Sequence, residues 1–365
     1  MPTGLCWRLS LSLLLGYLAL GQRDTLAAEA PAVEVTLGEL KVIGRPLLWN
    51  QQRVHLLARD GRLWDFAPSD AKDYHQTTEA FRSLSKNELR GELQREFGQG
   101  FEVTSTGNYL IVHPAGQQSQ WAERFESLYR SFLHYFTARG FRPTTPPFPL
   151  VAVIFPRQED FLRYAAREGQ KLPPQVLGYY HPYSNRVALY DTTAGQTGTA
   201  DWTTNAETII HEAAHQTAFN TGIHSRWSMP PRWVAEGLGT MFEARGVWDS
   251  PHFTAQKDRI NRGRFEAFQR YASSRRPKGA LAALIASDRV FQSDPDGAYA
   301  EAWALSFFLA ETEPRKYFAY LAKTASHRPF EAVRETDRLR DFTTVFGEDL
   351  GLLEAKLLRF IGDLK

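Results

Sequence analysis

Three things are scarce in this 365-residue chain: cysteine, net charge and internal repetition. Cys6 is the only cysteine, so the rest of the chain can form neither a thiolate-held metal site nor a disulfide framework. Lys and Arg number 43, and Asp and Glu number 41, which leaves a formal charge of +2. This charge is too small to indicate nucleic acid or an anionic membrane as a partner. The absence of a repeat excludes solenoid folds.

The N-terminal residues have the features of a secretory signal peptide. Arg8 supplies positive charge before the apolar run Leu9–Leu20, and Ala28-Glu29-Ala30 has the small residues of a cleavage site. The run is shorter than the roughly 20 residues that a membrane-spanning helix needs. We therefore expect a signal peptide over residues 1–30 and a secreted or periplasmic protein without stable membrane insertion. An uncleaved N-terminal anchor is the alternative.

Residues 31–115 are predicted to form a small β-rich N-terminal module. Val54–Ala58 and Leu63–Phe66 flank an Asp-Gly pair, which is a strong hairpin signal. A second hairpin is expected over residues 101–112, after a helix with a capping box at Ser85. The module carries no catalytic constellation. We expect it to dock onto the remaining domain or to cover a functional cleft.

Residues 116–365 are predicted to form an α+β domain. Gln118–Ala138 is an amphipathic helix with an apolar stripe at steps of three and four. Leu150–Phe155 is expected to be a buried strand, Arg157–Glu168 a helix, and Val176–Tyr190 two strands around a turn. The last third of the chain is predicted to be mostly helical.

A histidine pair with helical spacing lies in the most distinctive motif. His211-Glu212-Ala213-Ala214-His215 reads H-E-x-x-H, and a capping-box pattern at Thr204 and Glu207 marks the start of its helix. Residues four apart share one helix face, so His211 and His215 can bind one metal ion. Glu212 lies beside that face, where its carboxylate can take a proton from a water molecule held by the metal. A core helix whose histidines only hydrogen-bond to neighbours is the alternative.

A catalytic zinc ion usually has three protein ligands and one open position, so a third ligand is needed. Thr221 occupies the position six residues after the second histidine, which excludes one known arrangement, and His224 is out of that register. Glu236 is the better candidate, because Pro230-Pro231 is suited to starting a second helix just before it. Glu236 is followed by two glycines, Gly237 and Gly239, which are poor helix formers. Glycine is tolerable in a helix where another helix or a ligand must come close.

H-E-x-x-H followed by a W-x-x-E-G helix resembles the gluzincin zinc peptidases, with a peptidase MA-like catalytic domain, in which the third ligand is a glutamate. The motif is most similar to the membrane-alanyl-aminopeptidase type, whose second helix reads W-x-x-E-G-x-x-x-[YF]-x-E. The segment from about Asn108 to the C-terminus also resembles an uncharacterised bacterial family of secreted gluzincin-like peptidases, which brings no known substrate. Most of the second-helix pattern is occupied by Trp233, Glu236, Gly237, Phe242 and Glu243, with Met241 at the usual aromatic position and Phe242 one residue later.

This resemblance implies the fold of a thermolysin-like gluzincin catalytic domain. Such a domain has a small mixed sheet, a metal-site helix and a helical C-terminal lobe, here preceded by the β-rich module. In gluzincins an edge strand above the metal helix pairs with the extended substrate backbone, which is a general recognition mode. The matching segment is Gly178–Tyr190, for which an ordinary surface hairpin is the alternative.

We interpret the chain as a secreted zinc-dependent metallopeptidase that hydrolyses peptide bonds in a peptide or protein substrate. One Zn²⁺ ion would be held by His211, His215 and Glu236, with Glu212 as general base. The aminopeptidase type carries a G-x-M-E-N motif that grips the substrate's free amine. No such motif precedes His211, so an endopeptidase is favoured over an aminopeptidase. The alternative is a catalytically silent, zinc-stabilised binding protein of the cell envelope, which would have no need of Glu212.

The resemblance also indicates a hydrogen-bond donor for the oxyanion that forms at the substrate carbonyl. In the aminopeptidase type a tyrosine begins a helix of pattern Y-E-x-G-[FW]-x-L, and its hydroxyl points at this oxyanion. Tyr299 begins the similar Y-A-E-A-W-A-L, with Ala302 in place of glycine; a buried core tyrosine is the alternative. Glu243 or Thr240 is expected to orient a ligand histidine. Without Tyr299, the next candidate donors are Tyr179, Tyr180 and His181.

Overall fold

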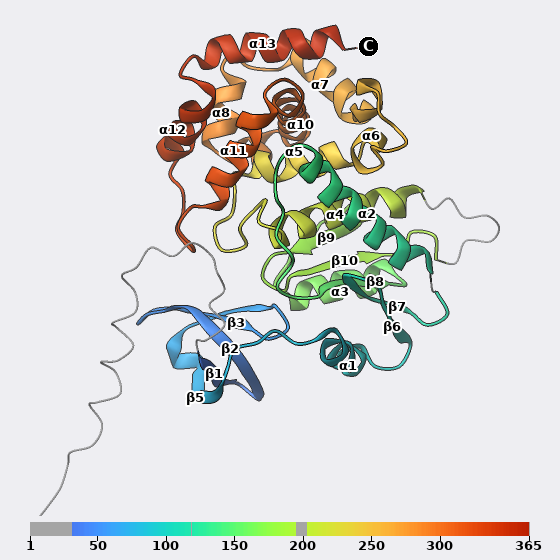
Figure 1. Cartoon of the computed structure of the whole chain (residues 1–365), viewed down its shortest axis with the longest axis vertical. Helices are drawn as coiled ribbons and strands as arrows, with labels where there is room; N and C mark the ends of the chain where they lie inside the picture. Colours follow the sequence, from blue (N-terminus) through green and yellow to red (C-terminus); the bar gives the residue numbers. More distant parts are fainter. Residues whose placement is uncertain (1–30, 118, 195–202, 365) are drawn as a thin grey trace, which may run out of the picture.

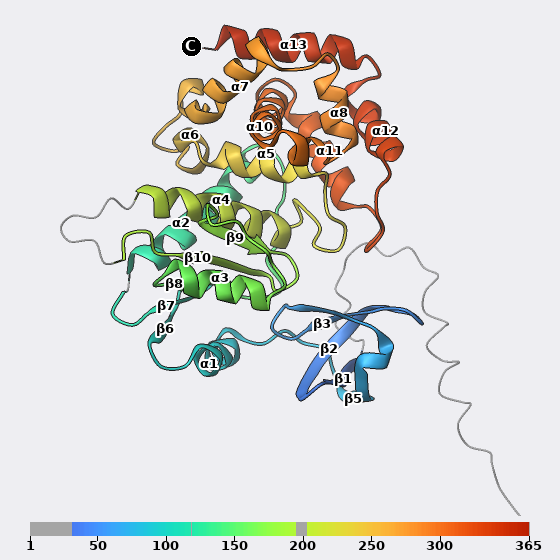
Figure 2. The same ribbon diagram turned by 180° about the vertical axis from the view of Figure 1, so that it is seen from behind.

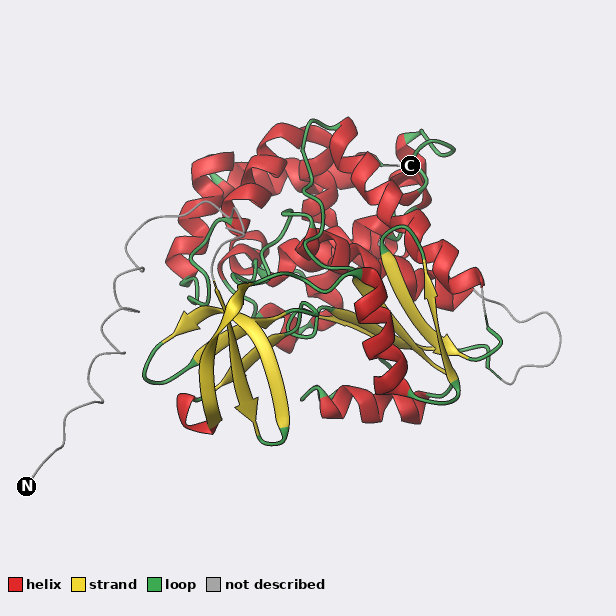
Figure 3. Ribbon diagram, turned by 60° about the horizontal axis from the view of Figure 1, so that its bottom comes forward, coloured by secondary structure: helices red, strands yellow, loops and turns green. Residues whose placement is uncertain are grey.

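The computed structural model describes residues 31–117, 119–194 and 203–364. The expected signal peptide over residues 1–30 lies outside this part of the chain. The described residues form two five-stranded sheets and a set of helices (Figure 1), and the strands fall into two separate groups (Figure 3). None of the described helices is long and apolar enough to cross a membrane.

The first sheet is antiparallel, with the strand order β4-β3-β2-β1-β5. The expected Asp-Gly hairpin is present, since Val54 pairs with Phe66 and Leu57 with Leu63. Gly61 lies in its turn with a positive φ of 90°. The strands are β1 (Pro31–Leu37), β2 (Leu40–Trp49), β3 (Val54–Ala58), β4 (Leu63–Phe66) and β5 (Ala71–Ala80), with the short 3-10 helix η1 (Pro68–Asp70) before β5.

The second sheet is mixed, with the order β6-β7-β8-β10-β9. Strands β7, β8 and β10 run parallel, while β6 and β9 are antiparallel to their neighbours. The hairpin expected in the N-terminal module, over residues 101–112, is part of this sheet instead, because Tyr109 to Val112 pair with β8. The strands are β6 (Phe101–Ser105), β7 (Tyr109–Pro114), β8 (Leu150–Phe155), β9 (Gly178–His181) and β10 (Arg186–Tyr190).

Helices cover both faces of the second sheet because its central strands are apolar on both sides. Alternate residues such as Leu150 and Ala152 pack with α2 and α4, whereas Val151 and Val153 pack with α1 and α3. The capping box expected at Ser85 is present at the start of α1. Thr204, in contrast, lies inside its helix and does not cap it. The helices are α1 (Lys86–Phe97), α2 (Ser119–Ala138), α3 (Gln158–Arg167) and α4 (Thr203–Asn220).

The C-terminal half is helical and is built around the buried helix α10 (Pro295–Thr312). Helix α5 (Arg232–Phe242) begins after Pro231, as expected, and packs between α4 and α10 (Figure 2). The remaining elements are α6 (Arg245–Trp248), η2 (Gln256–Arg259), α7 (Arg262–Ser274), α8 (Ala280–Ala286), α9 (Val290–Ser293), α11 (Pro314–Ala325), α12 (Glu335–Phe346) and α13 (Leu350–Asp363). The chain is thus an α+β protein with a small N-terminal β module and a helical C-terminal region. The residue at which one domain gives way to the next stays a prediction.

The crossing of α5 and α10 depends on Gly237. A Cβ atom at this position would overlap Ser306 Oγ and lie 2.5 Å from the carbonyl oxygen of Ala302. We expect Gly237→Ala to lower the free energy of unfolding by about 1–3 kcal/mol, because the two helices must move apart. Urea denaturation measures this change. Gly91→Ala is the control: its Cβ would meet only a side-chain nitrogen of Arg95 at 3.6 Å, so helix propensity should raise stability by about 1 kcal/mol. Equal stability of Gly237→Ala and the wild type would contradict the close crossing.

Candidate metal centre

Two histidines and one glutamate meet where α4 and α5 cross. Helix α4 places His211 and His215 one turn apart, and α5 brings Glu236 to them. The two Nε2 atoms are 3.1 Å apart, and Glu236 Oε2 lies 3.6 Å from each of them. Among the described residues, these three form the one group of His, Cys, Asp or Glu side chains that could hold a metal ion.

The donor atoms are spaced as a tetrahedral metal site requires. Zinc bonds to nitrogen and carboxylate oxygen are about 2.0–2.2 Å long, so tetrahedral ligand atoms lie roughly 3.3–3.6 Å apart. The separations of 3.1, 3.6 and 3.6 Å are close to these values. The side chains are 12% to 17% exposed, so solvent and a substrate can still reach a fourth position. The residues therefore fit a zinc ion with one open position.

Gly239 lets the two helices approach closely enough to form this cluster. A Cβ atom at this position would lie 3.0 Å from Cε1 of His211 and 3.1 Å from Cε1 and Nε2 of His215. Such separations are shorter than ordinary van der Waals contacts, so a side chain here would push against both imidazole rings. Gly237 serves the opposite side of α5, where α10 packs. The expectation that these two glycines mark close approaches is confirmed.

Glu243 and Asn261 fix the orientation of one ligand histidine. Glu243 Oε1 lies 2.8 Å from His211 Nδ1, and Asn261 Nδ2 donates to Glu243 Oε2 at 2.6 Å. Because a carboxylate only accepts hydrogen bonds, His211 Nδ1 carries a proton, and in the neutral imidazole Nε2 is the nitrogen whose lone pair is available to a metal ion. Thr240 has no such contact, since its hydroxyl donates to the backbone oxygens of Glu236 and Gly237.

Charge in the cluster favours a bound cation. Burial alone would lower the pKa of His211, but hydrogen bonds with Glu236 and Glu243 raise this pKa well above its usual value. Burial would raise the pKa of Glu236, but His211 and His215 hold it well below its usual range. The carboxylates thus stay ionised and stabilise positive charge between them. A metal ion can supply that charge in place of protons on the imidazoles.

Glu212 reaches back to the edge of the second sheet. Its Oε2 atom accepts a hydrogen bond of 2.8 Å from the backbone N–H of Tyr180 on β9. Of the hairpin singled out in the sequence, β9 is an edge strand, whereas β10 lies inside the sheet between β8 and β9. Gly178 keeps β9 close to α4, because a Cβ atom there would lie 2.8 Å from Thr208 Cγ2. The carboxylate that follows the first histidine is therefore held in place.

Tyr299 lies beside the cluster. Arg232 Nη2 donates to the Tyr299 hydroxyl at 3.3 Å, and Arg232 Nε is 3.5 Å from Glu236 Oε1. Burial, followed by the nearby Glu236 carboxylate, raises the pKa of Tyr299 to about 12. The hydroxyl therefore keeps its proton at neutral pH and can donate a hydrogen bond at the site.

The other candidate oxyanion donors are engaged elsewhere. The Tyr180 hydroxyl donates to Asn185 Oδ1 at 2.9 Å, and the Tyr179 hydroxyl donates to Glu168 at 3.0 Å. His181 Nδ1 is 3.5 Å from the same Glu168 carboxylate. Of the four side chains considered from sequence, Tyr299 is therefore the one placed next to the cluster.

Sequence reasoning missed two residues of the site. Arg232 lies one helical turn before Glu236, so its i, i+4 position was a readable signal. Asn261 precedes α7 and reaches Glu243 from a different element, so no local pattern reveals it. His224 is not part of the cluster: it is 1% exposed, and burial lowers its pKa to about 3.

A cleft of roughly 860 Å³ opens beside the cluster of His211, His215 and Glu236. One wall comes from α4, β9 and the two residues before β9. The other comes from the segment between α5 and α7 and the first turn of α7, and α10 contributes one residue. A cleft of this volume can take several residues of an extended chain or a compact ligand. Site residues that line it are His211, Glu212, Glu243, Asn261 and Tyr299.

Comparison with known proteins finds limited similarity. Residues 205–331 match a family described as a protein of unknown function (DUF1570), and this stretch contains the metal cluster and Tyr299. No curated protein matches the chain. Similar solved structures include the M1 zinc metallopeptidase from Deinococcus radiodurans (14% identity, 71% of this chain, 50% of that chain, TM-score 0.38) and a mutant of it bound to a Tyr-Ser-Ala substrate (15% identity, 71% and 50%, TM-score 0.39). The chain thus spans about half the length of these structures.

The contact at Gly239 predicts a loss of metal affinity on substitution. In Gly239→Ala the new methyl group must displace the rings of His211 and His215, whereas zinc–ligand distances tolerate deviations of only about 0.2 Å. We expect zinc affinity to fall about 10-fold or more, as measured by competition with a chelating dye. Gly362→Ala on α13 is the control, since its Cβ would meet nothing within 4 Å. Unchanged affinity in Gly239→Ala would argue against zinc at this crossing.

Proposed function

We propose that the chain is a secreted zinc-dependent peptidase of the gluzincin type. The observation that carries this proposal is the spacing of His211, His215 and Glu236, which matches a tetrahedral zinc site, with the Glu212 carboxylate held beside it. A purely structural metal site would be closed by a fourth protein ligand. The described cluster instead has three ligands and borders a cleft.

The neighbouring side chains suit peptide hydrolysis. A zinc ion bound here would lower the pKa of a water ligand to about 7 and polarise the scissile carbonyl. Glu212 accepts the proton of the attacking water and then passes it to the leaving amine. The Tyr180 amide holds one oxygen of this carboxylate and leaves the other free to exchange the proton. The Tyr299 hydroxyl donates to the carbonyl oxygen as negative charge develops on it.

The free edge of β9 is the proposed binding strand for the substrate. An extended peptide can add to a sheet edge through backbone hydrogen bonds, with alternate side chains in pockets. Strand β9 lies at the edge and lines the cleft at Gly178. Because no motif for a free amine precedes the metal helix, we propose cleavage within chains rather than removal of N-terminal residues.

A catalytically silent, zinc-stabilised binding protein of the cell envelope is the competing proposal. It accounts for the metal cluster but gives no role to the bond between Glu212 and Tyr180 or to the position of Tyr299. A digest of casein or of a peptide library, with and without a chelator, separates the two proposals. Zinc binding without any cleavage would favour the binding protein.

Replacement of the general base should separate metal binding from turnover. Glu212→Gln keeps the shape of the side chain and leaves the three ligands intact, so bound zinc should stay at one ion per chain. The cleavage rate should fall by roughly 10²–10⁴-fold, because the proton acceptor is lost. The control is Glu266→Gln on α7, whose carboxylate is 64% exposed; it should cleave at the wild-type rate. Full activity in Glu212→Gln would show that another group is the base.

Removal of the Tyr299 hydroxyl should affect the transition state more than binding. We expect Tyr299→Phe to bind zinc normally, to keep a similar KM and to lose about 10-fold or more in kcat. Tyr317→Phe is the matched control, because it removes a hydroxyl from a fully buried tyrosine of the same lobe. If kcat holds in Tyr299→Phe while the melting temperature falls, Tyr299 is a core residue without a catalytic role.

A further inference from the structure

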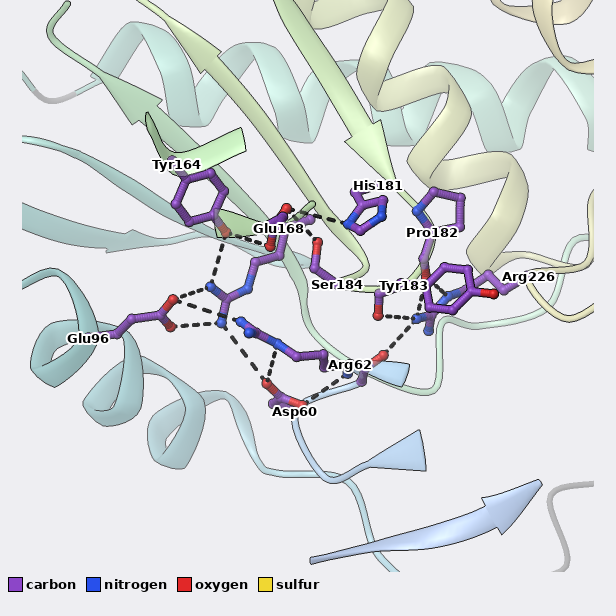
Figure 4. A network of polar contacts seen from close by, with 12 residues as sticks. Asp60, Arg62, Glu96, Tyr164, Glu168, His181, Pro182, Tyr183, Ser184 and Arg226 are labelled. Carbon is purple, nitrogen blue, oxygen red and sulfur yellow. Dashed lines mark hydrogen bonds and ion pairs between the residues drawn. The ribbon is translucent and has the colours of Figure 1, made fainter. Parts of the chain in front are cut away.

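The N-terminal module meets two parts of the site domain at one junction. Arg226, in the segment that joins α4 to α5, donates from Nη2 to the carbonyl oxygen of Gly61 at 2.7 Å. The same guanidinium donates from Nε and Nη2 to the carbonyl oxygen of Pro182 at 2.9 and 2.7 Å. Leu63 N also donates to Tyr183 O at 2.6 Å. One side chain therefore ties the β3–β4 turn (residues 59–62) to the β9–β10 turn (Figure 4).

Arg226 is an unusual choice for a structural contact. The residue is 7% exposed, and burial lowers the pKa of its guanidinium. Its hydrogen bonds all go to backbone carbonyl oxygens, although a buried cation is usually paired with a carboxylate. The guanidinium presents several donors in a fixed plane, which suits it to hold two turns at a defined separation.

Charged residues extend this junction to α1 and β10. Arg186 on β10 makes two hydrogen bonds to Glu96 on α1, at 2.6 and 2.9 Å, and lies 4.0 Å from Asp60 of the β3–β4 turn. Arg62, on the same turn, is 3.8 Å from both Asp60 and Glu96. The Arg186 side chain is only 5% exposed, so water screens these charges weakly. The turn is therefore held by the second sheet as well as by Arg226.

Strand β9 connects the junction to the general base. The buried Glu168 carboxylate accepts hydrogen bonds from the hydroxyls of Tyr179 and Ser184, at 3.0 and 3.1 Å, and lies 3.5 Å from His181 Nδ1. These residues lie on both sides of Tyr180, whose N–H holds Glu212. These contacts therefore couple the β9–β10 turn to the amide that holds Glu212.

We propose that the β3–β4 turn of the N-terminal module, acting through Arg226, is a positioning element of the site. It fixes β9, and with it the Tyr180 amide that holds Glu212, and it fixes the segment between the two ligand helices. The module would then be an integral support of the cleft, not a separate docking unit. The catalytic consequence of this inference rests on the proposed function; the structural consequence does not.

Arg226→Met tests the proposal in the full-length, zinc-loaded protein. The apolar side chain keeps the stem of arginine and removes the donors to Gly61 and Pro182. We expect amide hydrogen exchange over residues 178–181 to accelerate about 10-fold or more. Bound zinc should be unchanged, and kcat should fall about 10-fold with a smaller change in KM, because Glu212 loses its fixed position. Arg226→Lys keeps the charge but places its N–H donors on a single nitrogen, so it should recover part of both effects.

Two controls separate positioning from a general loss of stability. Lys41→Gln breaks an ion pair with Glu34 between β1 and β2 of the module, away from the β3–β4 turn; exchange over residues 178–181 and kcat should stay at wild-type values. Leu357→Ala lowers stability from the buried core beneath α13 and should leave local exchange in β9 slower than in Arg226→Met. If Arg226→Met exchanges no faster there than Leu357→Ala, the proposal is overturned. If the wild-type protein cleaves no peptide, the proposed function fails, while the exchange comparison still decides the positioning role.

Discussion

The close crossing of α4 and α5 is the contact on which the rest of the site depends. Two histidines on one helix cannot complete a zinc site, so the third ligand must arrive from a second helix at a fixed distance. Gly239 removes the side chain that would otherwise meet both imidazole rings, and Gly237 does the same on the opposite side, where α10 packs. Helix α5 is thus held tightly on two sides, and Glu236 has little freedom to move away from the histidines.

Polar side chains around the crossing of α4 and α5 orient the candidate ligands and the side chains next to them. Glu243 and Asn261 set the tautomer of His211, while Arg232 contacts both Glu236 and Tyr299. These residues come from α4, α5, α10 and the start of α7, so the site is held together by contacts between separate helices. A bound cation would stabilise this group of side chains, because the carboxylates of Glu236 and Glu243 stay ionised although they are partly buried.

Sequence patterns predicted the features that depend on a few neighbouring residues. They missed the contacts between residues that are far apart in the chain. Helical spacing in H-E-x-x-H, proline before a helix and the Asp-Gly turn each act over a few residues, and each is present in the structure. The hairpin at residues 101–112 was expected in the N-terminal module, but it joins the sheet of β8, because Tyr109 pairs with Leu150, about 40 residues further along the chain. Asn261 was missed for the same reason. Thr204 failed as a cap because the helix already includes it.

The first sheet contacts the second sheet at the turn that follows the edge strand β9. An edge strand has a backbone partner on only one side. Strand β9 has only four residues, and all of its backbone pairing within the sheet is with β10. It is therefore held by few hydrogen bonds of the sheet. Hydrogen bonds that Arg226 donates, and that Glu168 and Glu212 accept, hold this strand and its turn from outside the sheet. The N-terminal module adds to these contacts, because its residue Leu63 donates a backbone hydrogen bond to Tyr183 O and Gly61 O accepts one from Arg226.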